Sequence, residues 1–420
     1  MDLKPKGYEK IIQLIKMGVD IPNPLSLDIG EEVQPERISG HGVKIYPGCR
    51  IYGKETLIAS YARIGHEGPV TIESCQIGPK VELKGGYFKK AVFLEGASMG
   101  LAAHVREGCI LEEQSGGAHC VGLKQTILFP FVTLGSLINF CDCLMAGGTS
   151  RKDHSEVGSS YIHFNFTPSG EKTTPSLIGD VPRGVMLNEP PIFLGGQGGM
   201  VGPLRLGYGN VVAAGTILRQ DCKQENKLIV GKPHHGAVID FNPRAYPGLA
   251  RIVENNFLYL ANLKALEHWY VLVRQPFLRG QEFGEPIYTG LLDKLTLARE
   301  ERIKRLKAMA DKVADSLKQT SSKGPSGPGR REFHENIEGA CELFSREMSA
   351  DKTAEYRDRF LTLFTDHRKN EDGSYLEVVK RLPKAVSKEG TLWLEKIILD
   401  LCDRVATLFP SLELFKQTIR

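Results

Sequence analysis

The sequence predicts a mainly β protein, a parallel β-helix in which the chain winds into a solenoid, with an N-terminal helical cap and an α-helical C-terminal region. Three observations carry this prediction. From about Ile45 to Asp240, aliphatic residues recur every six positions, and small residues and glycine follow them. The chain holds 45 glycines in 420 residues, as a turn-rich solenoid needs. After Asp240 the apolar residues change to helical spacing.

The six-residue repeat is clearest in three segments. These are Ile45-Tyr-Pro-Gly-Cys-Arg-Ile51, Leu206-Gly-Tyr-Gly-Asn-Val211 and Val212-Ala-Ala-Gly-Thr-Ile217. One aliphatic side chain per repeat fills the interior of a triangular coil, and small residues let the chain turn at each corner. We therefore expect the β-helix to span residues 28–242, in on the order of ten to twelve coils.

Residues 1–27 are expected to form a helical cap, because residues 8–17 place their apolar side chains along one helical stripe. A solenoid end exposes unpaired strand edges, so a cap is physically required. The repeat breaks between Gly147 and Lys172. Such insertions leave the coil as loops, which on solenoids often form the binding face.

The region after the β-helix is predicted to be helical in two parts. Residues 243–320 form a helical extension with a long helix over about 288–318, whose charged run over 299–307 is expected to be a solvated helix face. Residues 321–333 are rich in Ser, Gly and Pro and are expected to be a flexible linker. The C-terminal helical region is 334–420, with its clearest helices over 335–348, 351–367 and 390–408.

The composition excludes several classes of protein. The 54 basic and 50 acidic residues give a net charge of +4, which offers no argument for a nucleic-acid partner, and we predict none. The nine cysteines form no Cys-x-x-Cys pair, and this odd count is typical of reduced, buried thiols. Neither an apolar signal core at the start nor an apolar run of membrane-spanning length is present. We therefore expect a cytoplasmic protein without a membrane partner.

The nearest set of metal-ligating side chains is Cys141, Cys143 and His154. A zinc site needs ligands clustered at short spacing, so these three residues are the candidate ligands. The alternative is that the two cysteines are buried thiols and the histidine is unrelated to them. We predict no metal.

A series of motifs between Glu95 and Pro233 keeps the order and approximate spacing of one known family. The motifs are Ala103-His-Val-Arg-Glu-Gly108, Gly117-Ala-His-Cys-Val-Gly-Leu-Lys124, His163-Phe-Asn-Phe166, Leu177-Ile-Gly-Asp180, Ile192-Phe-Leu-Gly195 and Val201-Gly-Pro-Leu-Arg-Leu-Gly207. Over about a third of its length the chain resembles the acetyltransferase half of the bifunctional UDP-N-acetylglucosamine pyrophosphorylase/glucosamine-1-phosphate N-acetyltransferase family. The resemblance implies a left-handed β-helix, a homotrimer, acetyl-CoA as acyl donor and a sugar phosphate or nucleotide sugar as ligand.

The pyrophosphorylase half of that family has no matching residues here. Its Gly-rich phosphate loop follows a first strand and ends in a lysine. The nearest Gly-rich run of this chain, Gly195-Gly-Gln-Gly-Gly199, lies within the β-helix and is expected to be a coil corner. We expect no pyrophosphorylase activity from these residues.

The resemblance implies a set of substrate-binding residues. Arg106 and Lys124 match the family's cations for the sugar phosphate, and a guanidinium suits phosphate because it binds two oxygens at once. The alternative for both is an exposed solenoid charge. Asn165 matches an asparagine that contacts the sugar, with an asparagine in a left-handed corner as its alternative. Lys172 falls one residue beyond the family's lysine, and Asn139 replaces a tyrosine.

At the position that matches the family's general base, this chain has a different type of residue. Transfer of an acyl group to an amine needs a base of near-neutral pKa, usually histidine. The position of the family's histidine, twelve residues after Lys124, is Ser136. His154 and His163, both within the insertion, are therefore the predicted catalytic residues. His104 and His119 match positions that look structural in the family.

The resemblance places coenzyme A along an outer groove, against small residues and backbone amides. Gly195, Gly196, Ala213 and Ala214 match those positions, and Lys232 is a candidate for contact with the cofactor's phosphates. The alternative is that these small residues are needed only for the close packing of the coils, as in any solenoid.

Two functional hypotheses follow. The first is an acyltransferase that moves an acyl group from acetyl-CoA to a sugar phosphate or nucleotide sugar. The second is a catalytically inactive sugar-nucleotide-binding or regulatory protein, with the C-terminal helices recognising a protein partner. The missing histidine favours the second, and the surviving binding motifs favour the first.

Overall fold

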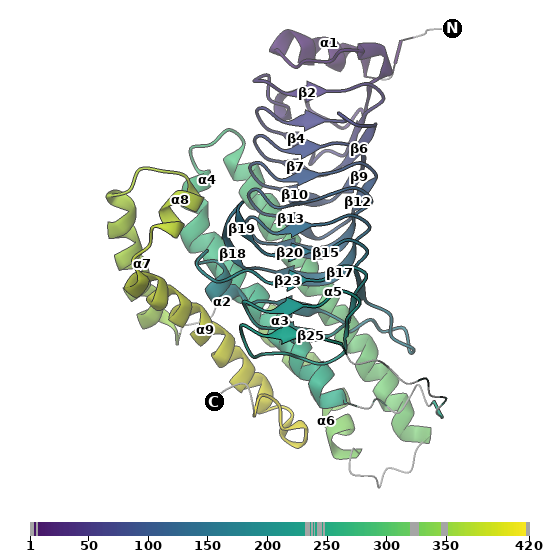
Figure 1. Ribbon diagram of the computed structural model, residues 1–420, viewed down its shortest axis with the longest axis vertical. Helices are drawn as coiled ribbons and strands as arrows, with labels where there is room; N and C mark the ends of the chain where they lie inside the picture. The colour runs from purple at the N-terminus through teal and green to yellow at the C-terminus, as the bar shows by residue number, and fades with distance from the viewer. Residues whose placement is uncertain are drawn as a thin grey trace.

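The computed structural model describes residues 4–5, 7–231, 236, 238, 240–241, 246, 248–319, 327–345 and 352–416. The chain is a parallel β-solenoid of about 11 turns, with a helix before it and a helical region after it. Figure 1 shows the solenoid as a stack of coils with the C-terminal helices along one side. The predicted fold class, a mainly β solenoid with helices at both ends, is confirmed.

Each turn lies in register on the turn before it. Lys44 pairs with Arg63 and Arg63 pairs with Glu82, so a turn takes 19 residues at this level. Glu82 then pairs with Ser98, which is 16 residues further on. Because side chains alternate across a strand, residues such as Ile45 point inward and are fully buried. The hydrogen bonds between turns therefore decide which outward side chain lies next to which.

The strands form three faces, and β15 and β17 bend from the second face to the third. Face 1 is the ten-stranded sheet of β2 (Lys44–Ile45), β5 (Arg63–Ile64), β8 (Glu82–Leu83), β11 (Ser98–Met99), β14 (Gly116–Gly117), β16 (Thr133–Leu134), β20 (Glu156–Val157), β23 (Phe193–Leu194), β26 (Val211–Val212) and β28 (Leu228–Ile229). Face 2 consists of β1 (Asp28–Ile29), β3 (Arg50–Tyr52), β6 (Val70–Glu73), β9 (Gly86–Lys89), β12 (Ala103–Val105), the first halves of β15 (Gly122–Leu128) and β17 (Asn139–Met145), β21 (Ile162–Phe164), β24 (Gly199–Val201) and β27 (Ile217–Leu218). Face 3 consists of β4 (Leu57–Ile58), β7 (Gln76–Ile77), β10 (Ala91–Phe93), β13 (Cys109–Leu111), the second halves of β15 and β17, β22 (Ser176–Ile178) and β25 (Leu204–Leu206).

We name each corner of the solenoid by the faces that it joins, so the chain passes corner 1–2, corner 2–3 and corner 3–1 in every turn. At corner 1–2, one residue per turn has a left-handed backbone. These residues are Ala102, Cys120, Leu137, Ser160 and Gln197, with φ between 51° and 62°, and then Gly215. The small residues expected at corners stand two positions earlier, where the turns approach closely: a Cβ on Gly195 would lie 2.4 Å from the backbone nitrogen of Ala214.

The interruption expected between Gly147 and Lys172 consists of two separate excursions. The first is the antiparallel hairpin of β18 (Gly148–Ser150) and β19 (Asp153–His154), at corner 3–1. The second joins β21 to β22 through residues 165–175, at corner 2–3. A further excursion at corner 3–1, in the next part of the chain, holds the short helix α2 (Val181–Gly184).

Apart from α2, the helices lie before and after the solenoid. Helix α1 (Tyr8–Met17) buries Ile11 and Leu14 against the first turn, where the short 3-10 segments η1 (Pro24–Ser26) and η2 (Pro35–Arg37) follow. The C-terminal region contains α3 (Leu249–Trp269), the π-helical segment η3 (Tyr270–Arg274), α4 (Gln275–Leu278), α5 (Gly284–Gln319), α6 (Gly327–Ser345), α7 (Ala354–Lys369), α8 (Tyr375–Lys380), α9 (Lys384–Ala406) and η4 (Pro410–Leu412). None of the helices in the described residues is long and apolar enough to cross a lipid bilayer.

The C-terminal helices cover face 3. Helix α5 contacts β7, β10 and β13, and α3 contacts β22. All residues of β10, β13 and β22 are consequently buried, whereas β12 on face 2 alternates between buried and exposed positions. Faces 1 and 2 are left for contacts with other molecules, and any site on the solenoid must be sought there or at its corners.

Two expectations about the helical region are wrong. Residues 327–333, expected to be part of a flexible linker, form the first turns of α6. The charged run over 299–307 is not simply a solvated face, because Arg302 is 2% exposed and forms an ion pair with Asp142 of the solenoid at 2.7 Å. A periodic pattern places charges on a helix but does not show which of them meets a buried carboxylate.

A buried ionic cluster fixes η3, the segment that follows α3, to corner 3–1. Arg274 of η3 is 1% exposed and pairs with Glu112 and Glu113, which follow β13. The hydroxyl of Tyr270 also donates a hydrogen bond to Glu112. Burial raises the pKa of Glu112 to about 7, since the guanidinium of Arg274 offsets that effect only in part. The Arg274 guanidinium lies 4.0 Å from the ring centroid of Tyr375, which brings α8 into the same contact.

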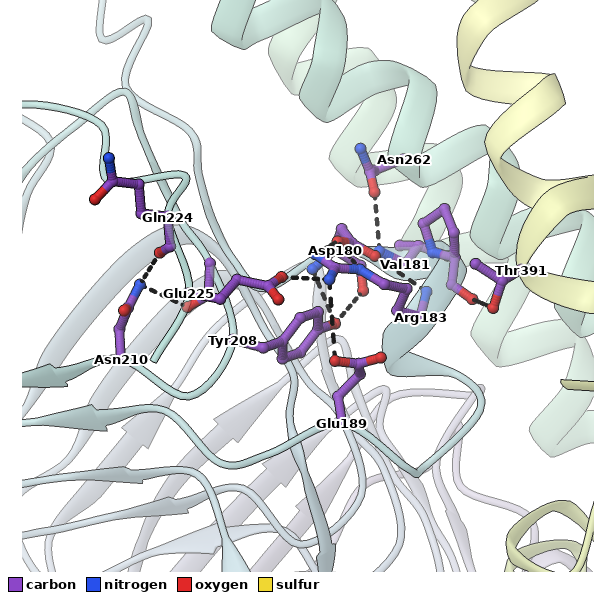
Figure 2. A network of polar contacts seen from close by, with 12 residues as sticks. Asp180, Val181, Arg183, Glu189, Tyr208, Asn210, Gln224, Glu225, Asn262 and Thr391 are labelled. Carbon is purple, nitrogen blue, oxygen red and sulfur yellow. Dashed lines mark hydrogen bonds and ion pairs between the residues drawn. The ribbon is translucent and has the colours of Figure 1, made fainter. Parts of the chain in front are cut away.

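A second polar network fixes α2 between the solenoid and the helices (Figure 2). Asp180 caps α2 by accepting from the backbone nitrogen of Arg183 at 3.0 Å, and its carboxylate also binds the Arg183 guanidinium at 2.6 Å. The backbone nitrogen of Val181 donates to Asn262 of α3 at 2.9 Å. The hydroxyl of Thr391 in α9 donates to the Pro182 carbonyl at 3.3 Å. These contacts join the solenoid to α3 and α9. The residues that meet are 81 and 209 positions apart in the sequence, so only folding brings them together.

Substitution Arg274→Met is expected to destabilise the protein by about 3–5 kcal/mol, because it leaves two buried carboxylates without their cation. Urea unfolding followed by tryptophan fluorescence reports on this region, since both tryptophans of the chain, Trp269 and Trp393, lie in its helices. Arg279→Met, at an exposed arginine five residues away, is the control. Equal stability of the two variants would contradict the structural role of the cluster.

Candidate functional site

The cations predicted to bind phosphate lie together at the edge of face 2. Val105 pairs with Leu123, so the next residues, Arg106 and Lys124, lie on consecutive turns beside each other at corner 2–3. Arg106 is exposed and makes no ion pair with any residue in the described part of the chain. Lys124 is half-buried, and its ammonium pairs with Glu107 at 2.7 Å. One cation is thus available to a ligand, and the second is held in place by a carboxylate.

Helix α5 forms a wall beside Lys124. A cavity of about 260 Å³ lies there, between Glu107, Lys124 and Gln125 of the solenoid and Leu297, Glu300, Glu301 and Lys304 of α5. Burial, the largest single influence, raises the pKa of Glu107, but the hydrogen bonds from Lys124 and from its own backbone, together with the charges of Lys124 and Arg106, give a net lowering of this pKa. The ion pair is therefore kept at neutral pH, and a phosphate at Lys124 has to share the ammonium with Glu107.

Asn139 occupies the middle of the same surface. It pairs with Gly122 on the preceding turn, and its side chain is exposed. A Cβ built on Gly122 would lie 3.6 Å from Asn139 Oδ1, so the glycine leaves the surface beside the amide free of side chain. Arg106, Lys124 and Asn139 are the predicted binding residues that the fold brings onto one surface.

The loop over 165–175 carries Asn165 and Lys172 at corner 2–3 and is held by α5. Arg302 donates to the backbone oxygen of Lys172 at 3.1 Å and to Asp142 at 2.7 Å. Lys172 has a left-handed backbone with φ of 58°, whereas Asn165 is not among the described residues of positive φ. The alternative that Asn165 occupies a left-handed corner is therefore wrong. Its side chain is half-buried and remains a predicted sugar contact.

Arg302→Gln is expected to loosen this loop. A charge-assisted contact is worth about 1.5–3 kcal/mol, so amide exchange within residues 165–175 should become about tenfold faster or more. Hydrogen–deuterium exchange measures this directly at the amides of Gly170 and Lys172, which both bond to Thr167 within the loop. The control is Arg305→Gln, which breaks a pair with Glu301 inside α5. Unchanged exchange in the Arg302 variant would show that Arg302 does not hold the loop.

His163 lies inside the solenoid rather than on its surface. Its side chain is 2% exposed, Nε2 lies 2.8 Å from the Ser176 hydroxyl, and the ring meets Phe140 edge-on. Burial lowers the pKa of His163 to about 4, although a hydrogen bond with the Cys141 backbone opposes that shift. The imidazole is neutral at pH 7, and the β21 backbone separates it from the outer surface that carries Asn139.

His154 lies on a different corner. It ends the hairpin of β18 and β19 at corner 3–1, and its buried Nδ1 has no hydrogen-bond partner among the described residues. The strands of face 1 separate this corner from face 2. The fold therefore does not bring His154 and His163 together with Arg106, Lys124 and Asn139, and their catalytic role remains a prediction.

The lowered pKa of His163 gives a test of its structural role. A base whose pKa is lowered on folding stabilises the fold above its unfolded value of 6.5, and this contribution is lost as the pH falls toward 4. We expect the free energy of unfolding to fall less over this window in His163→Gln than in the wild type. Urea unfolding at several pH values between 4 and 7.5 measures it, with the exposed His66→Gln as control. An identical pH dependence in all three proteins would contradict burial of a neutral imidazole.

The residues predicted to hold coenzyme A lie at corner 1–2. Gly195 and Gly196 lie between β23 and β24, and Ala213 and Ala214 occupy the same positions on the next turn, where the backbone nitrogen of Gly215 donates to Gly196. Their small side chains leave the corner backbone accessible, and they also satisfy the close approach of the turns. Lys232 lies outside the described residues.

Ser136 forms a contact at corner 1–2 that the sequence analysis did not anticipate. Its hydroxyl oxygen lies 2.8 Å from Nδ1 of His119 on the preceding turn. The backbone nitrogen of Ser136 donates to the Ser159 hydroxyl at 3.2 Å on the following turn. The signal was present in the spacing, since 17 residues separate His119 from Ser136 and a turn has about that length.

No group of three or more His, Cys, Asp or Glu side chains among the described residues is arranged to hold a metal ion. Cys141 and Cys143 lie on the two faces that β17 joins, and both thiols are buried. Burial raises the pKa of each thiol. These two cysteines and His154, the set considered for zinc, are therefore placed on three different parts of the solenoid.

The chain is similar to proteins named bifunctional protein GlmU. It is 28% identical to the Thermotoga maritima protein over 216 residues, which is 50% of this chain and 42% of the relative. It is 27% identical to the protein of Trichlorobacter lovleyi over 223 residues, 53% of this chain and 43% of the relative. No protein-family model matches the chain.

The resemblance inferred from the motifs is confirmed by these relatives, and the solenoid is consistent with the acetyltransferase half of GlmU. The match covers about half of this chain, and the chain spans less than half the length of the curated relatives it matches.

Proposed function

We propose that the protein transfers an acyl group from acetyl-CoA to an amine of a sugar phosphate or nucleotide sugar. The observation that carries this proposal is the arrangement on face 2. Arg106 and Lys124 lie on consecutive turns at one edge, Asn139 lies in the middle, and a corner of small residues borders the other edge. The similarity to GlmU over the solenoid supports it.

The sugar ligand is proposed to lie across face 2. Its phosphate binds Arg106, which is exposed and forms no ion pair with another described residue, and Lys124 reinforces this contact at the edge of the α5 cavity. Asn139 and Asn165 offer amide groups to sugar hydroxyls. His119 at corner 1–2 and Lys124 at corner 2–3 lie five positions apart, a distance of at most about 17 Å, which suits a sugar phosphate bound by long cationic side chains.

The acyl donor is proposed to lie along corner 1–2. Gly195, Gly196, Ala213 and Ala214 expose backbone there, and side chains on both adjoining faces are apolar at this level. These exposed apolar residues are Ile162, Phe164 and Ile217 on face 2 and Phe193, Val211 and Leu228 on face 1. An apolar surface beside exposed backbone suits a pantetheine arm, whose amides need partners and whose methylenes need cover.

The same apolar residues support a homotrimer. Toward the N-terminal end of face 1 the outward column is charged, with Lys44, Arg63 and Glu82, and it becomes apolar at Phe193, Val211 and Leu228. Apolar side chains in register on adjacent turns form a continuous patch, which is typical of an interface between subunits. The C-terminal helices pack on the solenoid's face 3, so the proposed subunit contact uses the two uncovered faces.

Calorimetric titration with acetyl-CoA and with UDP-N-acetylglucosamine tests the proposal. We expect saturable binding of acetyl-CoA, and we expect Arg106→Gln to weaken the nucleotide sugar about tenfold to a hundredfold, because a charge-assisted phosphate contact is lost. Arg50→Gln is the control, since Arg50 is exposed on face 2 several turns away. Binding of the nucleotide sugar without acetyl-CoA would instead indicate an inactive binding protein. Binding of neither ligand would overturn the proposal.

A further inference from the structure

We propose that His119, held by Ser136, is the general base of the transfer reaction. This inference rests on the proposed function and deepens it. The family resemblance implies a structural role for His119, and the catalytic residues predicted from the sequence are His154 and His163. The geometry points to an imidazole on the outer surface, at the corner where the acyl donor and the sugar surface meet.

His119 and Ser136 occupy equivalent positions on consecutive turns. Each directly precedes the left-handed residue of corner 1–2, Cys120 in one turn and Leu137 in the next. The backbone nitrogen of Leu137 donates to the His119 carbonyl at 3.1 Å, which locks the two turns in this register. The 2.8 Å contact between Ser136 Oγ and His119 Nδ1 is thus imposed by the stacking of turns and is not a chance meeting of mobile side chains.

The corner column that holds this pair also holds the donor residues. In the order of the turns, the column reads His119, Ser136, Ser159, Gly196 and Ala214, as the hydrogen bonds between successive turns show. An acyl donor that lies along Gly196 and Ala214 has Ser159, Ser136 and His119 ahead of it on the same edge. On the other side, the strand that leaves the corner leads to Gly122 and then to Lys124. The imidazole therefore stands between the two proposed ligands.

The other histidines of the solenoid are less suited to this role. His163 is enclosed in the core, and His154 is at corner 3–1. His104 is exposed on face 2, but its ring packs edge-on against Tyr87 at 5.2 Å and lies a turn further from Asn139. Only His119 combines exposure, a fixed orientation and a place beside both proposed ligand surfaces among the described solenoid residues.

The proton balance of the step fixes the tautomer. The step requires the tautomer in which Nδ1–H of His119 donates to Ser136 Oγ, because Nε2 is then the unprotonated nitrogen. The amine nitrogen of the sugar attacks the thioester carbonyl carbon of acetyl-CoA, and a C–N bond forms. The C–S bond breaks, the thiolate of coenzyme A leaves, and the amine proton passes to Nε2 of His119. Ser136 acts as a positioning residue, since it touches the imidazole and not the reacting atoms.

The test is turnover of acetyl-CoA with glucosamine 1-phosphate as the acceptor probe, with the N-acetylated product detected by mass spectrometry. Loss of a general base typically costs a factor of about 10²–10⁴, so His119→Gln should lower kcat at least about a hundredfold, with the KM values within about twofold of wild type. His104→Gln, at an exposed histidine on face 2, is the matched control and should keep wild-type turnover. Circular dichroism and thermal melting confirm that each variant is folded.

Two further variants separate positioning from catalysis. Ser136→Ala should lower kcat about tenfold with little change in KM, and Ser136→Thr, which keeps the hydroxyl, should restore most of it. Nitrogen-15 chemical shifts of His119 should show the Nδ1-protonated tautomer in the wild type and a mixture in Ser136→Ala.

The outcomes distinguish this inference from the proposed function. Wild-type turnover that persists within about threefold in His119→Gln overturns the assignment of the base and leaves the transferase proposal standing. Absence of wild-type turnover, together with absence of acetyl-CoA binding, overturns both. A loss of turnover in His104→Gln equal to that in His119→Gln also overturns the assignment.

Discussion

The in-register stacking of parallel turns is the constraint on which the rest of the molecule depends. Backbone hydrogen bonds along the solenoid axis place residues 16 to 19 positions apart next to each other in the regular turns, for example Arg63 beside Glu82 and Glu82 beside Ser98. Functional groups are therefore assembled as columns. Arg106 and Lys124 meet at corner 2–3 and His119 and Ser136 meet at corner 1–2 for the same reason, and neither pair needs a long-range loop to bring it together.

The helical region decides which surfaces of these columns remain accessible. Helices α3 and α5 bury face 3, and the ionic clusters around Arg274 and Arg302 fix the helical region there. Each cluster joins a cation to a carboxylate from a distant part of the chain, with at least one of the partners largely buried, so the docking is specific in register as well as favourable. This docking also affects the candidate site. Arg302 of α5, which pairs with Asp142, also donates to the backbone of Lys172 and so holds the loop over 165–175.

The site shows how far a sequence pattern reaches. The alignment of Arg106 with Lys124 could be expected from motif spacing alone, since 18 residues separate them and a coil has about that length. The same count pairs His119 with Ser136, whereas the catalytic residues predicted from the sequence, His154 and His163, belong to the predicted insertion. Those two histidines are close to the binding residues in the sequence only. An excursion can leave the solenoid at any of three corners, and the side of departure depends on where the strand ends, which the repeat does not encode.

Two strands of face 3 show why the sequence does not predict which helices cover this face. The segments Ala91-Val-Phe93 and Cys109-Ile-Leu111 are apolar at consecutive positions, the pattern of a strand buried on both sides. This signal indicates that some element covers face 3, but not which one. By itself the sequence determined the solenoid, its approximate length and the helices that follow, because these depend on local periodicity. Only the tertiary structure decided which face the helices cover, which charges are buried and which histidine reaches the surface, because these depend on contacts between residues far apart in the chain.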